Sequence, residues 1–272
     1  MTAHSLVTRR MLLRDMGKAG VAVMVLGTAA CSSDVTDNTT PTPGDGSAPS
    51  SSTDSSTSIP PDSTTSTGAG PTSTGSTGPG HRWHRANLGF VSAYILYRGG
   101  EAALVDTGVG GSEGDIESAL GEIGLDWGSV GHVIVTHRHP DHQGSLQAVI
   151  AASGAPWYAG AGDMEAITAT TEGNSVATGD EVFDLRIIET PGHTPGHVSV
   201  LDDAAGILVA GDALNGADGG VAGPNPDFSD DMEAANASAR MLASFEYETV
   251  LFGHGEPVLE GGRDAVADLV SG

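Results

Sequence analysis

The sequence predicts an α/β or α+β fold in which helices cover β-sheets. Short apolar runs rich in Val, Ile and Leu alternate with segments whose apolar residues recur at helical spacing. Turn-forming residues separate neighbouring apolar runs, as at residues 98–101, where Arg-Gly-Gly-Glu predicts a hairpin. The same order, strands and then a helix, occurs in both halves of the region from residue 81 onwards.

Each element follows from its local pattern. We expect strands at residues 90–97, 102–105, 132–135, 156–159, 182–188, 198–201, 207–210 and 249–252. We expect helices at residues 115–123, 145–152, 231–245 and 258–270, and a helical turn at 163–167. Gly124 is placed to end the first helix, and residues 215–229, rich in Gly, Asn and Pro, are expected to form a loop.

Composition divides the chain into three parts. Residues 1–31 place basic residues ahead of a short apolar run, which predicts an export signal and not a membrane-spanning helix. Residues 32–80 are mostly Ser, Thr, Pro, Gly and Asp, and cannot bury enough apolar surface to offset their ordering entropy. We therefore expect a disordered linker there, followed by a folded catalytic domain at residues 81–272.

The first part also carries two export patterns. Residues 8–14 resemble a twin-arginine signal, which implies export of a protein that is already folded. Cys31, the only cysteine, follows small residues and resembles the lipidated residue of a bacterial lipoprotein. The alternative is a plain signal cleaved near Ala30, with Cys31 a free thiol. As a lipoprotein, the chain would lie at the outer face of the cytoplasmic membrane and touch it through its N-terminal lipid only.

The charge of the expected domain excludes one class of partner. Residues 81–272 hold 29 Asp and Glu against 7 Arg and no Lys, a net charge of −22. Such a surface repels the phosphate backbone of nucleic acids. We therefore expect a small-molecule substrate and no nucleic acid, while the sequence gives no oligomeric state.

Residues 136–142 concentrate groups that bind metals. His137 and His139 lie two apart after an expected strand, so in extended chain they point to the same side, and Pro140 favours that geometry. Asp141 and His142 then turn towards a neighbouring position that could hold a second metal. The alternative is a polar turn that is rich in histidine by chance.

Three further candidate ligands, His193, Asp212 and His254, each follow another expected strand. Strand ends at one edge of a sheet converge, so these side chains can form one site with the first cluster. Imidazole and carboxylate ligands suit zinc, and also iron or manganese.

The motifs together resemble the metallo-β-lactamase superfamily. They are L-V-D-T-G at residues 104–108, H-R-H-P-D-H at 137–142, T-P-G-H-T-P-G-H at 190–197, A-G-D-A at 210–213 and G-H-G at 253–255. The five motifs occur in the order that the family shows and span nearly all of residues 88–256, which is far more specific than a match to any single motif. The resemblance implies a four-layer αββα sandwich with two metal ions, expected to be Zn²⁺, at one sheet edge.

The resemblance also implies a role for each ligand. His137, His139 and His193 would bind the first metal, and Asp212 would bridge both metals. The second metal would take Asp141, His142 and His254. Two ions about 4 Å apart would share a hydroxide that serves as the nucleophile, and Asp141 would also act in catalysis by steering the proton.

Residues near the expected ligands have supporting roles with alternatives. Asp106 is expected to accept a hydrogen bond from a ligand histidine or from nearby backbone, or else to cap a turn. His197 is expected to support the site without being a ligand. Asn215 and the 218–227 loop are candidate substrate contacts. Five further side chains are given no chemical role. Trp157 and Tyr158 are assigned to the core, His132 to the surface or the core, and His81 and His84 to a solvated edge of the domain, with lining of the site entry as the alternative.

These features favour a metal-dependent hydrolase of an ester, lactone or thioester. Within the family, Asp212 disfavours β-lactam hydrolysis, because true metallo-β-lactamases usually carry Cys or Ser there. Glyoxalase II enzymes add a C-terminal helical domain, whereas 18 residues follow His254 here. Two alternatives remain. One is a mononuclear iron oxidoreductase resembling persulfide dioxygenases, and the other is a metal-binding module without catalysis.

Overall fold

The computed structural model describes residues 80–272. The expected export signal, the candidate lipidation residue Cys31 and the expected linker up to residue 79 lie outside the described residues. Within the described range, no helix combines the length and apolar character needed to cross a membrane.

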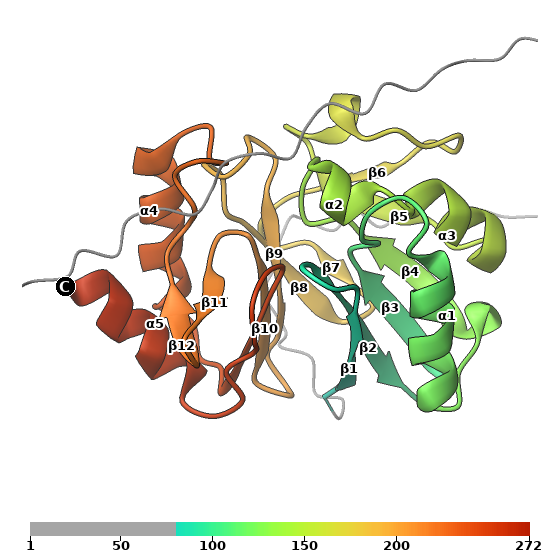
Figure 1. Cartoon of the computed structure of the whole chain (residues 1–272), viewed down its shortest axis with the longest axis horizontal. Coiled ribbons are helices and arrows are strands. Elements are labelled where there is room, and N and C mark those ends of the chain that lie inside the picture. Colours follow the sequence, from blue (N-terminus) through green and yellow to red (C-terminus); the bar gives the residue numbers. More distant parts are fainter. Residues whose placement is uncertain (1–79) are drawn as a thin grey trace, which may run out of the picture. The chain divides into compact units, whose positions relative to one another are not determined.

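The first sheet has six strands in the order β1-β2-β3-β4-β5-β6, with β1 to β3 antiparallel and β3 to β6 parallel (Figure 1). These strands are Arg82–Asn87, Ser92–Arg98, Glu101–Val105, Val130–Ile134, Trp157–Gly160 and Asn174–Val176. Helices α1 (Glu113–Glu122) and α3 (Leu146–Ser153) cover its outer face. The connections contain the short helices η1 (Trp127–Ser129), α2 (Pro140–Gln143) and η2 (Met164–Ala166).

The second sheet has five strands in the order β13-β10-β9-β8-β7. In that order they are Thr249–Phe252, Ile207–Gly211, Val198–Asp202, Leu185–Glu189 and Glu181–Val182. Helices α4 (Met232–Leu242) and α5 (Gly262–Ser271) pack on its outer face. A separate hairpin, β11 (Asn215–Ala217) and β12 (Gly220–Ala222), lies between β10 and α4 in the chain.

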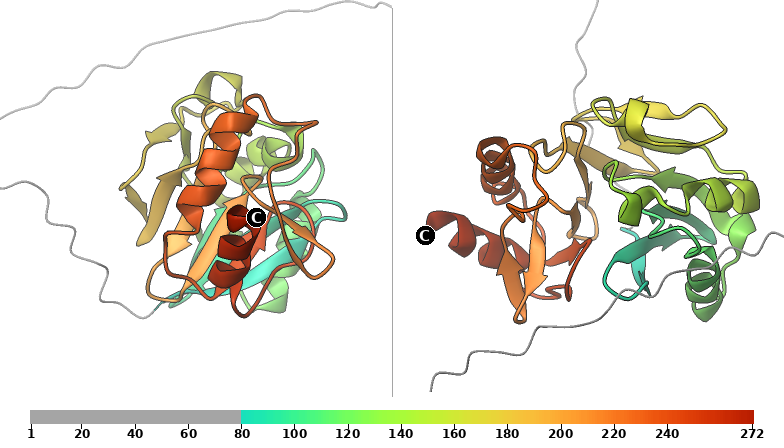
Figure 2. Two further views of the ribbon diagram at one scale, coloured as in Figure 1. Left: turned by 90° about the vertical axis from the view of Figure 1, so that its left-hand side faces the viewer. Right: turned by 45° about the horizontal axis from the view of Figure 1, so that its top comes forward.

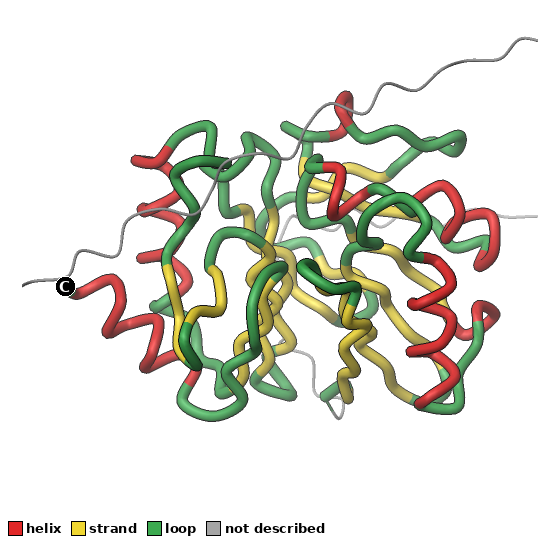
Figure 3. The backbone as a smooth tube through the Cα atoms, in the orientation of Figure 1, coloured by secondary structure: helices red, strands yellow, loops and turns green. Residues whose placement is uncertain are grey.

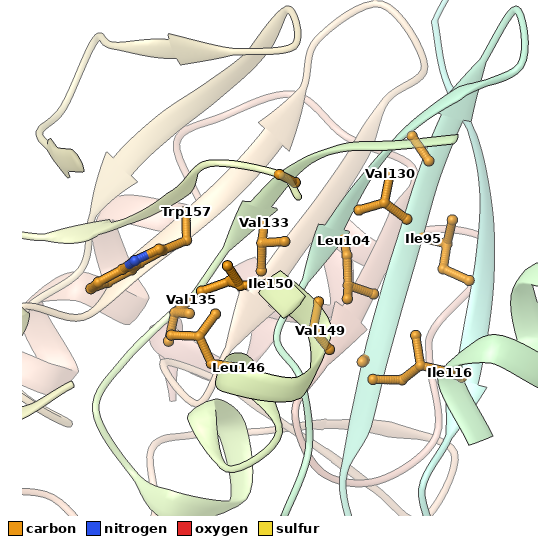
Figure 4. Packing of buried hydrophobic residues seen from close by; sticks show 14 of the residues in the cluster. Ile95, Leu104, Ile116, Val130, Val133, Val135, Leu146, Val149, Ile150 and Trp157 are labelled. Atoms are coloured by element: carbon orange, nitrogen blue, oxygen red, sulfur yellow. The ribbon is translucent and has the colours of Figure 1, made fainter. Parts of the chain in front are cut away.

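Three apolar clusters fill the three interfaces between the layers. One joins α1 and α3 to the first sheet (Figure 4), one lies between the sheets, and one joins the second sheet to α4 and α5. In β3, Leu104 packs into the first cluster and its neighbours Ala103 and Val105 into the second. Both faces of this strand are buried, which explains its continuous apolar run. The expected four-layer αββα sandwich is confirmed, and Figure 2 shows its layers from two further sides.

Three expected elements differ from the structure. The prediction of a single strand at residues 182–188 is wrong, because Phe183 and Asp184 both have positive φ and turn the chain between β7 and β8. The expected loop at 215–229 contains the β11–β12 hairpin. The last helix begins at Gly262, because Val258 is still paired with Val250 by two backbone hydrogen bonds.

The start of the domain also departs from expectation. Residues 82–87 form strand β1, which was not predicted and pairs along its whole length with β2. His81 is buried and not at a solvated edge, because its backbone N–H and its Nδ1 both lie 2.7 Å from the carboxylate of Asp202. His84 is half-buried and lies 3.0 Å from Glu122.

We expect Leu104→Ala to lower the free energy of unfolding by about 2–5 kcal/mol, because the substitution leaves a cavity in a fully buried position. Leu259→Ala is the matched control, since Leu259 is 56% exposed and should change stability by less than about 0.5 kcal/mol. Urea unfolding of both variants measures the difference. Equal losses would contradict the assignment of Leu104 to the core.

Candidate metal centre

Loops that follow four strands bring the candidate ligands together. His137, His139, Asp141 and His142 follow β4, His193 follows β8, Asp212 follows β10 and His254 follows β13. Asp141 and His142 lie in the short helix α2, which is drawn red in Figure 3, and the other candidate ligands lie in segments drawn green. β4 belongs to the first sheet and the other three strands to the second, so the site needs both sheets.

Three imidazole nitrogens form the first group. His137 Nε2 lies 3.1 Å from His139 Nδ1 and 3.2 Å from His193 Nε2, and the latter two atoms are 2.9 Å apart. Zinc–nitrogen bonds of 2.0–2.1 Å in tetrahedral geometry place neighbouring ligand nitrogens about 3.3 Å apart. The triangle therefore has roughly the size that one ion needs.

Asp141, His142 and His254 form the second group. Asp141 Oδ2 lies 3.4 Å from His254 Nε2 and 3.9 Å from His142 Nε2. Asp212 lies between the two groups, since its Oδ2 is 3.4 Å from His193 Nε2 and 3.2 Å from His254 Nε2. A single carboxylate thus faces both groups, as a bridging ligand must.

Two buried atoms show that these residues fit metal ions. His142 Nε2 and Asp212 Oδ1 are buried, 3.4 Å apart, and neither has a hydrogen-bond partner among the described residues. Buried polar atoms are normally paired, so a cation gives both atoms the partner they lack. A donor set of five imidazoles and two carboxylates suits zinc, and also iron or manganese. That these residues bind metal stays a prediction.

Three of the candidate ligand histidines are oriented by a contact of the other ring nitrogen. His142 Nδ1 lies 2.8 Å from Asp106 Oδ2, His254 Nδ1 donates to the Phe90 carbonyl at 2.8 Å, and His193 Nδ1 lies 3.3 Å from Ser229 Oγ. Such partners fix the ring orientation and the tautomer of a metal-binding histidine.

Asp106 lies where the sequence analysis expects a supporting carboxylate. Besides its contact with His142, it accepts hydrogen bonds from the backbone and side chain of Thr136. Asp106 therefore holds one ligand and the segment that leads to the others. His197 uses both ring nitrogens on the protein: Nε2 accepts from the Asp212 N–H at 3.0 Å, and Nδ1 lies 2.7 Å from Thr190 Oγ1. Neither nitrogen is left for a metal.

Burial and charge set the protonation of the site. Burial lowers the pKa of His193 to about 4 and holds the pKa of His137 well below its usual range, so both rings are neutral at pH 7. Hydrogen bonds to the carboxylates of Asp141 and Asp212 raise the pKa of His254 to about 10. Neutral imidazole is the form that binds metal, so a metal at His254 would displace a proton.

Asp163 is a site residue that the sequence analysis missed. Its buried carboxylate accepts hydrogen bonds from the backbone N–H of Arg138 at 2.9 Å, the hydroxyl of Thr194 at 2.5 Å and the backbone N–H of Gly196 at 3.0 Å. Arg138 stands between His137 and His139, and Thr194 follows His193. One carboxylate therefore joins the two segments that supply the first ligand group. An isolated Asp in an expected helical turn gave no signal of this role.

A pocket of about 430 Å³ opens beside the ligands. Besides candidate ligand residues it is lined by Pro140, by two amides, Asn215 and Asn225, and by two aromatic rings, Phe90 and Phe228. Asn215 was expected to contact substrate, and Asn225 belongs to the expected 218–227 loop. The two phenylalanines were not foreseen, because exposed aromatic residues in loops form no periodic pattern.

The curated relatives of the chain include an uncharacterized protein and several hydroxyacylglutathione hydrolases. Over 198 residues the chain is 32% identical to the uncharacterized protein YobT of Bacillus subtilis (strain 168), covering 61% of this chain and 83% of that protein. Over 122 residues it is 36% identical to a hydroxyacylglutathione hydrolase of Hahella chejuensis, covering 42% of this chain and 43% of the hydrolase. The chain spans half or less of the length of such hydrolases.

Solved structures show the same fold at low sequence identity. A metallo-beta-lactamase family protein from Thermus thermophilus matches with a TM-score of 0.56 and 24% identity, over 71% of this chain and 78% of that one. Metallo-beta-lactamase SMB-1, in a complex with mercaptoacetic acid, matches with a TM-score of 0.57 and 16% identity, over 71% and 91%. The model of the metallo-beta-lactamase superfamily matches residues 86–254, which begin in β1 and end at His254. The chain therefore belongs to the metallo-beta-lactamase superfamily.

Proposed function

We propose that the protein is a metal-dependent hydrolase of an ester, lactone or thioester, with two zinc ions. The observation that carries this proposal is the convergence of seven donor side chains beside an open pocket, with Asp212 between two complete ligand groups. His137, His139 and His193 would hold one ion. Asp141, His142 and His254 would hold the other, and Asp212 would contact both.

Bound metal ions would polarise the acyl carbonyl and lower the pKa of water towards about 7. The net reaction adds water across the acyl C–O or C–S bond: the hydroxyl joins the acyl carbon, and the leaving oxygen or sulfur departs with its electron pair and takes a proton. No Ser, Thr, Cys or Lys lines the described pocket. The pocket therefore lacks these nucleophiles for a covalent route, in keeping with direct attack by water.

Asp141 is the residue best placed to accept the proton that the attacking water loses. Its carboxylate lines the pocket, and its hydrogen bond with His254 lowers its pKa below the usual value although burial opposes this. Asp141 is therefore ionised at neutral pH and can accept a proton from water. Asp212, which is more deeply buried, lies between the ligand groups and serves to fix their spacing.

The relatives support hydrolysis, and the site disfavours the two alternatives. Several matched relatives are named hydroxyacylglutathione hydrolase. A mononuclear iron oxidoreductase needs only the first group, whereas Asp141, His142 and His254 also lie together here. A binding module without catalysis needs no pocket, whereas the ligands His139, Asp141 and His254 line one.

We also propose that the protein is exported and anchored through a lipid on Cys31, on the sequence features of residues 1–31. We expect Cys31→Ser to move the protein from the membrane fraction to the soluble fraction of its host, because the acyl chains supply the membrane affinity. Immunoblotting of the fractions measures this. A wild-type protein that is itself found in the soluble fraction would contradict the anchor.

For the metal centre, we expect about two zinc ions per chain by elemental analysis and turnover of at least one member of an ester, lactone and thioester panel. Asp212→Asn should reduce the rate of hydrolysis by more than about 100-fold. Substitution of a residue that merely hydrogen-bonds a metal ligand typically lowers metal affinity or activity by about 10–100-fold, and Asp212 is expected to be a ligand itself. Asp264→Asn is the control, because this carboxylate is exposed on α5. Two bound ions without turnover would contradict the hydrolase, and one iron per chain would favour the oxidoreductase.

For Asp163, we expect Asp163→Asn to weaken metal binding by about 10–100-fold, because it disturbs both segments of the first ligand group. Asp202→Asn is the matched control, because Asp202 is equally buried and also accepts two backbone hydrogen bonds. Asp202 is the last residue of β9, whereas the site residue His197 immediately precedes the first residue of that strand. Competition with a chromophoric chelator measures affinity, and thermal unfolding measures stability. Equal effects of both variants on affinity would show that Asp163 is merely structural.

A further inference from the structure

Two exposed phenylalanines stand at the mouth of the pocket. Phe90 is 64% exposed and Phe228 is 65% exposed, and both line the pocket. The described residues contain two other large apolar side chains that are exposed, Leu259 and Leu269, and neither lines this pocket. Apolar side chains that gather in solvent beside a site commonly mark a binding surface.

The segments that carry both rings are anchored to the candidate ligands. The Phe90 ring stacks on the His254 ring with centroids 6.1 Å apart and planes 7° apart, while the Phe90 carbonyl accepts the His254 Nδ1 proton. Phe228 donates its N–H to the Asn225 carbonyl, and the next residue, Ser229, contacts His193. The backbone that carries each ring is therefore anchored, because each phenylalanine lies within one residue of a hydrogen bond to a candidate ligand histidine.

Apart from the candidate ligands, no positively charged side chain of the protein lines the pocket. Its lining has no Arg or Lys, and its non-ligand polar groups are the uncharged amides of Asn215 and Asn225. Asn215 Nδ2 donates to the Gly223 carbonyl, whereas Asn225 Nδ2 has no partner among the described residues. The N–H groups of the Asn225 side chain can therefore donate hydrogen bonds to a neutral substrate.

The arginines near the pocket are already paired. Arg85 contacts Glu256 at 2.8 Å and the Gly255 carbonyl at 3.1 Å, next to His254. Arg138 contacts Asp163 at 3.1 Å and Asp230 at 2.6 Å. Three exposed carboxylates lie near the pocket. Asp227 precedes Phe228 in the chain, Asp230 is paired with Arg138, and Glu256 is paired with Arg85. A negatively charged substrate tail would meet these carboxylates without an unpaired cation.

We propose that the site selects uncharged substrates whose apolar acyl group lies between Phe90 and Phe228, and that it rejects substrates with an anionic tail. This inference rests on the proposed hydrolase function and narrows its substrate class. It also distinguishes the protein from enzymes that hydrolyse glutathione thioesters, because the tripeptide of those substrates carries carboxylates. A volume of about 430 Å³ suits a small acyl ester or lactone.

The first experiment uses zinc-loaded full-length protein and 4-nitrophenyl acetate, butyrate and hexanoate, with the 4-nitrophenyl monoester of adipic acid as the anionic match for hexanoate. We expect kcat/KM to rise about two- to fourfold for each added methylene. The adipate monoester should be at least about tenfold slower than the hexanoate ester. Equal rates for these two esters, or no dependence on chain length, would overturn the inference.

Variants assign the selectivity to the two rings. In Phe90→Ala/Phe228→Ala the ratio of hexanoate to acetate turnover should fall towards one. Leu259→Ala is the control, because it removes a similarly exposed apolar side chain outside the pocket and should keep the wild-type ratio. A double variant that keeps the full chain-length dependence would show that the rings do not bind the acyl group.

A binding series separates this inference from the hydrolase proposal. Calorimetric titration with acetohydroxamate, hexanohydroxamate and octanohydroxamate should show tighter binding with each methylene in the wild type but not in the double variant. If that series holds while no ester, lactone or thioester is hydrolysed, the hydrolase proposal fails and the apolar pocket stands. If esters are hydrolysed while the hydroxamates bind equally, the pocket inference alone fails.

Discussion

The buried carboxylate of Asp212 is the constraint on which the site depends. Burial alone would raise the pKa of Asp212, but the neighbouring His142 and His254 hold it well below its usual value, so the group stays charged inside the protein. A buried charge is tolerated only when it is paired and surrounded by polar partners. The surrounding backbone leaves room for this: a Cβ at Gly253 would come within 2.2 Å of Asp212 Oδ1, so this position requires glycine.

The pairing of Asp212 with His142 ties the two sheets together at their edge. His142 reaches the site from the first sheet, and Asp212 follows β10 of the second sheet. The apolar cluster between the sheets, which contains Val105 and Ile134 of the first sheet and Val209 of the second, sets the distance between these strands. The geometry of the ligands is therefore a consequence of core packing as well as of the loops, and rigid strands are what allow seven donors to meet.

The positions of the candidate ligands follow more directly from local sequence pattern than their surroundings do, for a physical reason. Ligands follow apolar strands, and the periodicity of a strand is a local property, so the ends of β4, β10 and β13 could be placed from local pattern. The β7–β8 turn could not, since Phe183 in the left-handed region runs against its preference and is imposed by tertiary packing. Asp163 and Ser229 act through contacts with residues 25 or more positions away, and no local pattern encodes such contacts.

The walls of the pocket and the orientation of the ligands share the same short segments. Phe90 presents its ring to the pocket and its carbonyl to His254, and residues 225–229 carry Phe228 at the pocket and Ser229 against His193. A change in these segments that reshapes the pocket therefore also shifts the partner of a ligand histidine, and such partners tune metal affinity. In the proposed enzyme, specificity and metal binding would therefore be coupled. Side-chain changes at Phe90 that leave its backbone in place are consequently the simplest route to altered selectivity with an intact metal centre.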